Sequence, residues 1–123
     1  MAKRKLYSEP LRKVSDNASL FLVKSERPVD PGWIRYVTFG SCYDDTDTGT
    51  SIEFGMWKNG AFISMEGTAT LTKSIPKMTT QATHVFRTGE LPAFRVIGAD
   101  ASDVLLGFLE GYETEYEEVV TVG

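Results

Sequence analysis

Residues 51–65 have the sequence SIEFGMWKNGAFISM, and this stretch decides the fold class. Apolar side chains alternate with polar or small ones from Ile52 to Met56, and a period of two predicts a half-buried β-strand. Asn59-Gly60 follows, and because both residue types tolerate a positive φ, this pair favours a tight hairpin turn. Residues 61–65 then return as the second strand of the hairpin.

The same strand pattern recurs along most of the chain. The 123 residues include 28 β-branched Val, Ile and Thr together with 11 Gly, a composition that favours strands and turns over helices. Gly40 is expected to mark a bulge or bend. Ser8-Glu9-Pro10 is expected to begin one helical turn, since proline suits that position. Further strands are predicted at residues 19–24, 33–43, 68–71, 83–87 and 93–97.

Residues 102–112 fit two patterns. Ser102 and Asp103 could cap a helix, and the apolar residues that follow have helical spacing. In a strand, Val104, Leu106 and Phe108 would share one face, while Leu105 and Leu109 would share the other. Two internal glycines, Gly107 and Gly111, would each cost a helix about 1 kcal/mol, so we expect a strand. Altogether about eight short strands predict a single antiparallel all-β sandwich or barrel.

Composition excludes several classes of protein. The length fits one domain, and a single cysteine, Cys42, rules out an internal disulfide framework and a multi-cysteine zinc site. We expect no cofactor, no membrane span and no secretory signal, because no run approaches roughly 20 apolar residues and no apolar region follows the basic start. The net charge of −4 argues against a nucleic-acid binder.

Charge is concentrated at the two ends of the chain. We divide the chain into a basic arm at residues 1–18, a sandwich domain at 19–113 and an acidic tail at 114–123. The termini are either simply solvated or dock onto neighbouring copies. Under the docking hypothesis, deletion of residues 1–12 should impair assembly and leave the fold intact. The candidate partner-binding residues are Lys3, Arg4, Lys5, Arg12, Lys13, Trp57, Glu115, Glu117 and Glu118.

Three sets of residues are weak candidates for chemistry. A loop site for calcium would use Asp45, Asp47 and Glu53 from the region of Asp44–Asp47, although a polar turn explains these aspartates equally well. Cys42 with His84 could form a nucleophile and base, but a buried structural thiol is the better interpretation. A carboxylate pair of the glycosidase type would combine Glu53 or Glu66 with a loop aspartate.

Aromatic residues offer a fourth possibility. They could form a sugar-binding face, because aromatic rings stack on apolar surfaces, or they could simply fill the core. Trp57 beside Lys58 would suit an exposed contact at the hairpin tip. The candidates are Trp33, Tyr36, Tyr43, Trp57 and Phe62.

The order of turns and strands resembles a known family. A Pro-Gly turn precedes the strand in Val29–Val37, an aspartate-rich turn and the Ile52–Met65 hairpin follow, and Arg87–Pro92 and Gly98–Leu106 lead to a final Glu110–Glu113. Over residues 19–113 this is similar to the small jelly-roll structural proteins of tailed-bacteriophage virions, such as head-decoration and head-fibre subunits.

The resemblance implies a jelly-roll-like sandwich with a structural role. It implies a non-enzymatic virion subunit that forms a homo-oligomer and contacts neighbouring virion subunits, with no nucleic acid or membrane as partner. A second class of function stays open, namely a carbohydrate- or receptor-binding sandwich module. Saturable glycan binding detected by tryptophan fluorescence would favour the second class.

Overall fold

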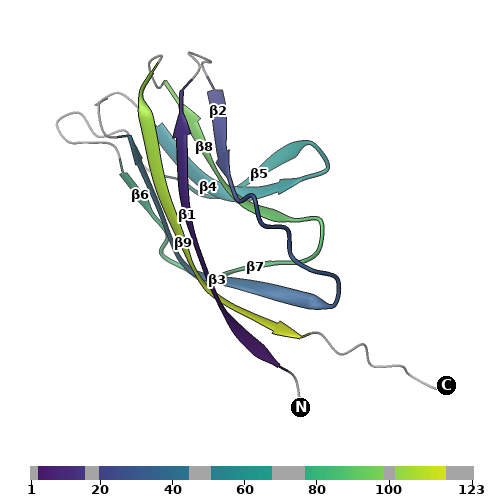
Figure 1. The fold of residues 1–123 in the computed structure, drawn as a ribbon. Coiled ribbons are helices and arrows are strands. Elements are labelled where there is room, and N and C mark those ends of the chain that lie inside the picture. Colours follow the sequence, from purple (N-terminus) through teal and green to yellow (C-terminus); the bar gives the residue numbers. More distant parts are fainter. Residues whose placement is uncertain (1–2, 16–19, 45–50, 68–76, 99–101, 116–123) are drawn as a thin grey trace.

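The protein folds into two antiparallel β-sheets packed face to face (Figure 1). The computed structural model describes residues 3–15, 20–44, 51–67, 77–98 and 102–115. Its strands are β1 (Arg4–Val14), β2 (Leu20–Lys24), β3 (Trp33–Asp44), β4 (Ser51–Lys58), β5 (Ala61–Gly67), β6 (Lys77–Thr79), β7 (His84–Phe86), β8 (Leu91–Ile97) and β9 (Val104–Glu115). The predicted all-β sandwich is confirmed.

The strand order is that of a jelly roll. One sheet runs β1-β9-β3-β6, with β7 also paired to β3, and the other runs β2-β8-β4-β5. β6 pairs with the later part of β3 and β7 with the earlier part, so the two short strands share one position and the five-stranded sheet is four positions wide. Successive segments cross repeatedly from one sheet to the other, as in a double Greek key of eight strands.

Aromatic and aliphatic side chains fill the space between the sheets. Phe54 of the four-stranded sheet meets the edge of Phe86 of the five-stranded sheet, with ring centroids 6.0 Å apart. Phe94 lies beside Phe54 at 5.2 Å, and Leu105 and Leu109 of β9 are fully buried against the same cluster. These side chains alternate along their strands with outward-facing ones, as the pleat of a sheet requires.

The hairpin predicted at residues 51–65 forms β4 and β5. Asn59 and Gly60 both have positive φ, 52° and 78°, as the tight turn demands. The expected strand at residues 102–112 is also confirmed, as β9. The irregularity expected at Gly40 lies slightly earlier, between Val37 and Phe39 on β3.

Two expectations for the start of the chain differ from the structure, and one expected strand lies outside the described residues. Ser8-Glu9-Pro10 forms no helical turn but lies within β1, because its backbone pairs with β9. Residues 4–14 of the expected arm are therefore a sheet strand, and Tyr7 and Leu11 contribute to the core. Lys77–Thr79, for which the sequence analysis made no prediction, forms β6. The strand expected at residues 68–71 lies outside the described residues.

Candidate interaction surface

The outward side of the five-stranded sheet is unusually apolar. Leu6 is 90% exposed, Val14 46% and Phe39 38%. Antiparallel sheets normally carry polar residues on a solvated face, and a contiguous exposed apolar patch marks an interaction site. We call this surface the apolar outer face, and its residues are Leu6, Pro10, Val14, Ile34, Tyr36, Phe39, Tyr43, Val104, Leu106, Phe108 and Tyr112.

Strand register places the side chains of this face in rows across β1, β9 and β3. Leu6, Tyr112 and Tyr36 form one row, in which the two tyrosine rings stack with centroids 4.8 Å apart. The guanidinium of Arg4 lies 3.9 Å from the centroid of the Tyr112 ring. The β3 irregularity adds to the face, because it leaves Phe39 exposed beside the exposed Thr38.

Few charged side chains interrupt the apolar outer face. Arg12 and Glu110 lie on it, both exposed, two rows apart on the neighbouring strands β1 and β9. Within the described residues neither side chain forms an ion pair with another side chain. Among the described residues near the centre of this face, Arg12 and Glu110 are therefore a cation and an anion without an ion-pair partner, whereas Arg4 at the end of the face lies over the Tyr112 ring.

A buried polar network holds β1 against the rest of the sandwich. The Glu9 carboxylate accepts hydrogen bonds from Tyr7 Oη at 2.6 Å, Ser25 Oγ at 2.5 Å and the Glu26 backbone N–H at 2.8 Å. Burial raises the pKa of Tyr7, and its hydrogen bond to Glu9 raises it further. The three donors satisfy a carboxylate that is only 4% exposed, so it can lie inside the fold.

A second network fixes the register of β3 and β9 at the end of the sandwich near the termini. Arg35 and Glu113 are opposite each other in the sheet, and Arg35 Nε donates to Glu113 Oε2 at 3.0 Å. Lys5 Nζ lies 3.5 Å from both Glu113 and Asp30, and it also sits 4.2 Å from the centroid of the Trp33 ring. The network is structural, because each charge has a partner within the chain.

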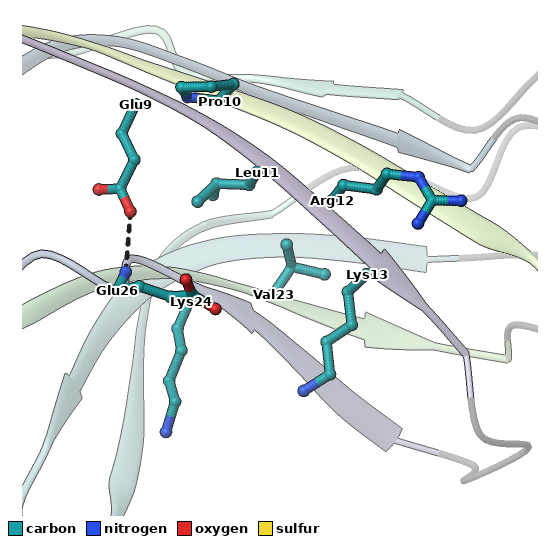
Figure 2. Close-up of a pocket in the computed structure, with 8 residues that line it drawn as sticks. All are labelled: Glu9, Pro10, Leu11, Arg12, Lys13, Val23, Lys24 and Glu26. Carbon is teal, nitrogen blue, oxygen red and sulfur yellow. Dashed lines mark hydrogen bonds between the residues drawn. The ribbon is translucent and has the colours of Figure 1, made fainter.

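A shallow groove follows the seam where β1 and β2, the edges of the two sheets, approach each other (Figure 2). Its volume is about 290 Å³, and Leu11 and Val23 lie between the two strands. The only hydrogen bond drawn there joins Glu9 to the Glu26 backbone. The remaining lining residues are Pro10, Arg12, Lys13 and Lys24.

The structure separates the predicted partner-binding residues into several locations. Antiparallel pairing brings the basic start of β1 beside the acidic end of β9 in the same chain, so that Lys5 binds Glu113 and the Lys3 carbonyl accepts from the Glu115 N–H at 2.9 Å. Trp57 lies on the other sheet, with Lys24 Nζ 4.7 Å from its ring centroid. Glu117 and Glu118 lie outside the described residues.

The structure does not bring Cys42 and His84 together. Their sheet partners on neighbouring strands are Met78 and Val37 respectively. Val37 and Cys42 lie opposite Gly111 and Gly107 of β9, four positions or about 13 Å apart along the strand. Burial raises the pKa of the Cys42 thiol, and the nearby Asp44 charge raises it further. A thiol in that state is a poor nucleophile.

The predicted carboxylates are engaged elsewhere. Glu53 binds Arg95, and Glu66 binds His84 and the backbone N–H groups of Gln81 and Ala82. Asp44 is buried, whereas residues 45–47 of the proposed calcium loop lie outside the described residues. Within the described ranges no three His, Cys, Asp or Glu side chains cluster as metal ligands would.

The aromatic candidates do not form one binding strip. Tyr36 and Tyr43 lie on the apolar outer face, whereas Phe62 lies on the four-stranded sheet, 4.8 Å from the Arg95 guanidinium. Trp33 packs partly against the core. The alternation of residues in β9 indicated the apolar outer face, because this strand is apolar on both of its sides. The residues of β1 that complete the face were not recognised, because the sequence analysis assigned them to an arm.

Comparisons with known proteins give a likeness of fold. No family model matches the chain, and no curated protein matches it. Among solved structures it is similar to the virus-like particle of Macrobrachium rosenbergii extra small virus, with 12% identity, TM-score 0.45 and coverage of 95% of this chain and 81% of that chain. It is also similar to a Bacillus endospore appendage pilus, with 12% identity, TM-score 0.45 and coverage of 94% and 92%.

A third similar structure is TmCBM61 in complex with β-1,4-galactotriose, with 14% identity, TM-score 0.33 and coverage of 94% of this chain and 88% of that chain. At these identities the likeness concerns the arrangement of strands and not the function. No helix in the described residues is long and apolar enough to cross a membrane. The chain is an all-β, two-sheet sandwich with jelly-roll strand order.

Proposed function

We propose that this protein is a non-enzymatic structural subunit of a virus particle, repeated on the surface or tail of a bacteriophage virion, where it contacts copies of itself and neighbouring virion subunits. One observation carries the proposal, which is the apolar outer face of the five-stranded sheet, with Leu6 90% exposed. Such a face is stabilised by a protein partner. The resemblance of the turn pattern to phage accessory subunits supports the virion assignment.

The arrangement of polar groups also fits a structural role. The buried charges Glu9, Arg35 and Glu113 all bind groups of their own chain, and Glu66 and His84 bind each other across the two sheets. These contacts stabilise the sandwich. Contact between subunits would then depend on exposed surface, and repeated weak contacts in an assembly become strong through multivalency.

Solution size and particle imaging test the proposal. We expect the purified chain to self-associate in sedimentation velocity and to form ordered assemblies, or to decorate particles, in negative-stain microscopy. A chain that stays at its monomer mass of 13.6 kDa, and that binds neither itself nor phage particles, would contradict a structural virion role.

A carbohydrate- or receptor-binding module is the second candidate function, and one feature favours it. Trp33 lines a depression of about 250 Å³ with Gly32, Ile34, Arg87 and Thr88, and an aromatic ring beside polar groups suits a sugar. One face of the ring already carries the Lys5 ammonium, which limits stacking. Saturable quenching of Trp33 fluorescence by a glycan, abolished in Trp33→Leu and retained in Trp57→Leu, would support this function over the first.

A further inference from the structure

We propose that the apolar outer face binds the same face of a second copy, and that a two-fold axis crosses the strands at Phe108. The inference rests on the proposed self-assembly, and it adds which surface makes the contact and which symmetry relates the two copies. Two-fold contacts are self-complementary, so each residue of the face must meet a suitable residue of an identical face. Five of the six outward rows of side chains across β1, β9 and β3 meet a counterpart row in this way.

The rows follow from the strand register. Successive outward rows are about 6.7 Å apart along the strands. In order from the termini they are Arg4–Thr114–Ile34, Leu6–Tyr112–Tyr36, Ser8–Glu110–Phe39, Pro10–Phe108–Ser41, Arg12–Leu106–Tyr43 and Val14–Val104. The Phe108 row lies midway between the row that contains Glu110 and the row that contains Arg12.

Rotation by 180° about an axis along the Phe108 row exchanges these two charged rows. Arg12 of one copy then lies over the Ser8 row of the other, one strand away from Glu110. Packed sheets are about 10 Å apart and neighbouring strands about 4.8 Å apart, a gap that an arginine and a glutamate side chain can span together. The symmetry produces two such ion pairs, and both use charges that have no side-chain partner within the described chain.

The apolar rows match as well. The same rotation places the row of Leu6, Tyr112 and Tyr36 over the row of Val14 and Val104, while Phe108 meets its own copy on the axis. The five rows that overlap under this rotation, over three strands, cover about 27 Å by about 14 Å, a projected area of about 380 Å² per copy, and the Arg4 row extends beyond the overlap. Interfaces of this size are at the weak end of the range, so we infer a concentration-dependent dimer.

The free edge of β1 is a poorer docking site than the face. β1 is the outermost strand of its sheet, and along its outer edge the Ser8 carbonyl accepts a hydrogen bond from Arg27 Nη1 at 2.8 Å. Pro10 lies near its middle and has no N–H to donate, a feature that protects edge strands from pairing with another chain. Pro10 does not hinder a contact through the apolar outer face, because that contact uses side chains and not backbone pairing.

Charge reversal tests the geometry. We would compare the wild-type chain with Arg12→Glu, Glu110→Arg and the double variant by sedimentation equilibrium over a wide concentration range. Each single reversal places like charges together and should weaken dimerisation at least about tenfold. The double variant restores opposite charges and should return the dissociation constant to near the wild-type value. Lys13→Glu is the matched control, because Lys13 is the exposed neighbour of Arg12 on β1 and strand alternation places its side chain on the side of the strand away from the apolar outer face.

The outcomes separate this inference from the proposed function. Unchanged circular dichroism and thermal midpoints would show that each variant folds. If the wild-type chain self-associates but the single reversals have no effect, or the double variant does not recover, this face-to-face geometry is wrong and the structural role stands. If the wild-type chain stays monomeric at every concentration, both the geometry and the self-assembly fail.

Discussion

Gly111 on β9 gives the sharpest test of how the five-stranded sheet is built. A Cβ at this position would lie 1.8 Å from the Tyr36 carbonyl oxygen and 2.9 Å from its carbon. Gly111 pairs with Val37, next to the irregularity in β3. Real Cβ contacts are essentially never below 3.0 Å, so Gly111→Ala must push β3 and β9 apart by more than about 1 Å.

Moving β3 and β9 apart lowers the free energy of unfolding in two ways. Overpacking costs about 1–3 kcal/mol, and the loss of one or two ladder hydrogen bonds adds about 0.5–1.5 kcal/mol each. We therefore expect Gly111→Ala to lower the free energy of unfolding by about 3–5 kcal/mol, a large share of the roughly 5–15 kcal/mol typical of a domain.

Gly107, four residues away on the same strand, is the matched control. A Cβ there would meet Leu11 Cβ and the Ser41 carbonyl oxygen at 3.3 Å, which small shifts can relieve. Alanine also recovers about 0.5–1 kcal/mol of backbone entropy, so Gly107→Ala should stay within about 1 kcal/mol of wild type. Urea unfolding followed by tryptophan fluorescence measures both variants. Equal stability of the two would refute the close approach of β3 and β9 at the irregularity.

Three further predictions concern other parts of the sandwich. Burial alone would raise the pKa of Glu66, but the hydrogen bonds from His84 and two backbone N–H groups outweigh burial and lower that pKa. The resulting stabilisation is present above the usual pKa of 4.5 and is lost as pH falls through the lowered pKa. Glu66→Gln should therefore be less stable than wild type near neutral pH and show a shallower loss of stability in an acid titration, whereas an unchanged acid transition would count against the contact. Cys42, fully buried, should resist thiol reagents in the folded chain and react in denaturant, whereas rapid native labelling would show that β3 is not packed as described. Deletion of residues 1–12 should abolish folding, because it removes most of β1; a truncated chain with cooperative unfolding would restore the expectation of a dispensable arm.

Local pattern was sufficient for much of the fold. Asn59-Gly60 determines its turn through backbone conformation alone, and the two internal glycines indicated a strand rather than a helix at residues 102–112, most of which lie in β9. Gly111 has a specific reason to be glycine, because a neighbouring carbonyl occupies the place of its Cβ. These features depend on residues close in sequence or on a single backbone contact.

β1 could not be predicted because its pattern includes a buried charge. Tyr7, Glu9 and Leu11 alternate inward, but an acidic residue at an inward position hides the period of two. Glu9 is buried only because Ser25 and the Glu26 N–H reach it from a distant segment. The full extent of the apolar outer face was missed for the same reason, since Leu6, Pro10 and Val14 join it only when β1 pairs with β9.

The concentration dependence of the solution mass tests the central claim most directly. Sedimentation equilibrium of the wild-type chain should show a mass that rises with concentration from 13.6 kDa towards twice that value. The Leu6→Asp variant, altered at the most exposed apolar residue of the face, should remain at the monomer mass throughout. A wild-type mass that stays at the monomer value, or a Leu6→Asp variant that associates as well as wild type, would contradict the account of this face as a contact surface.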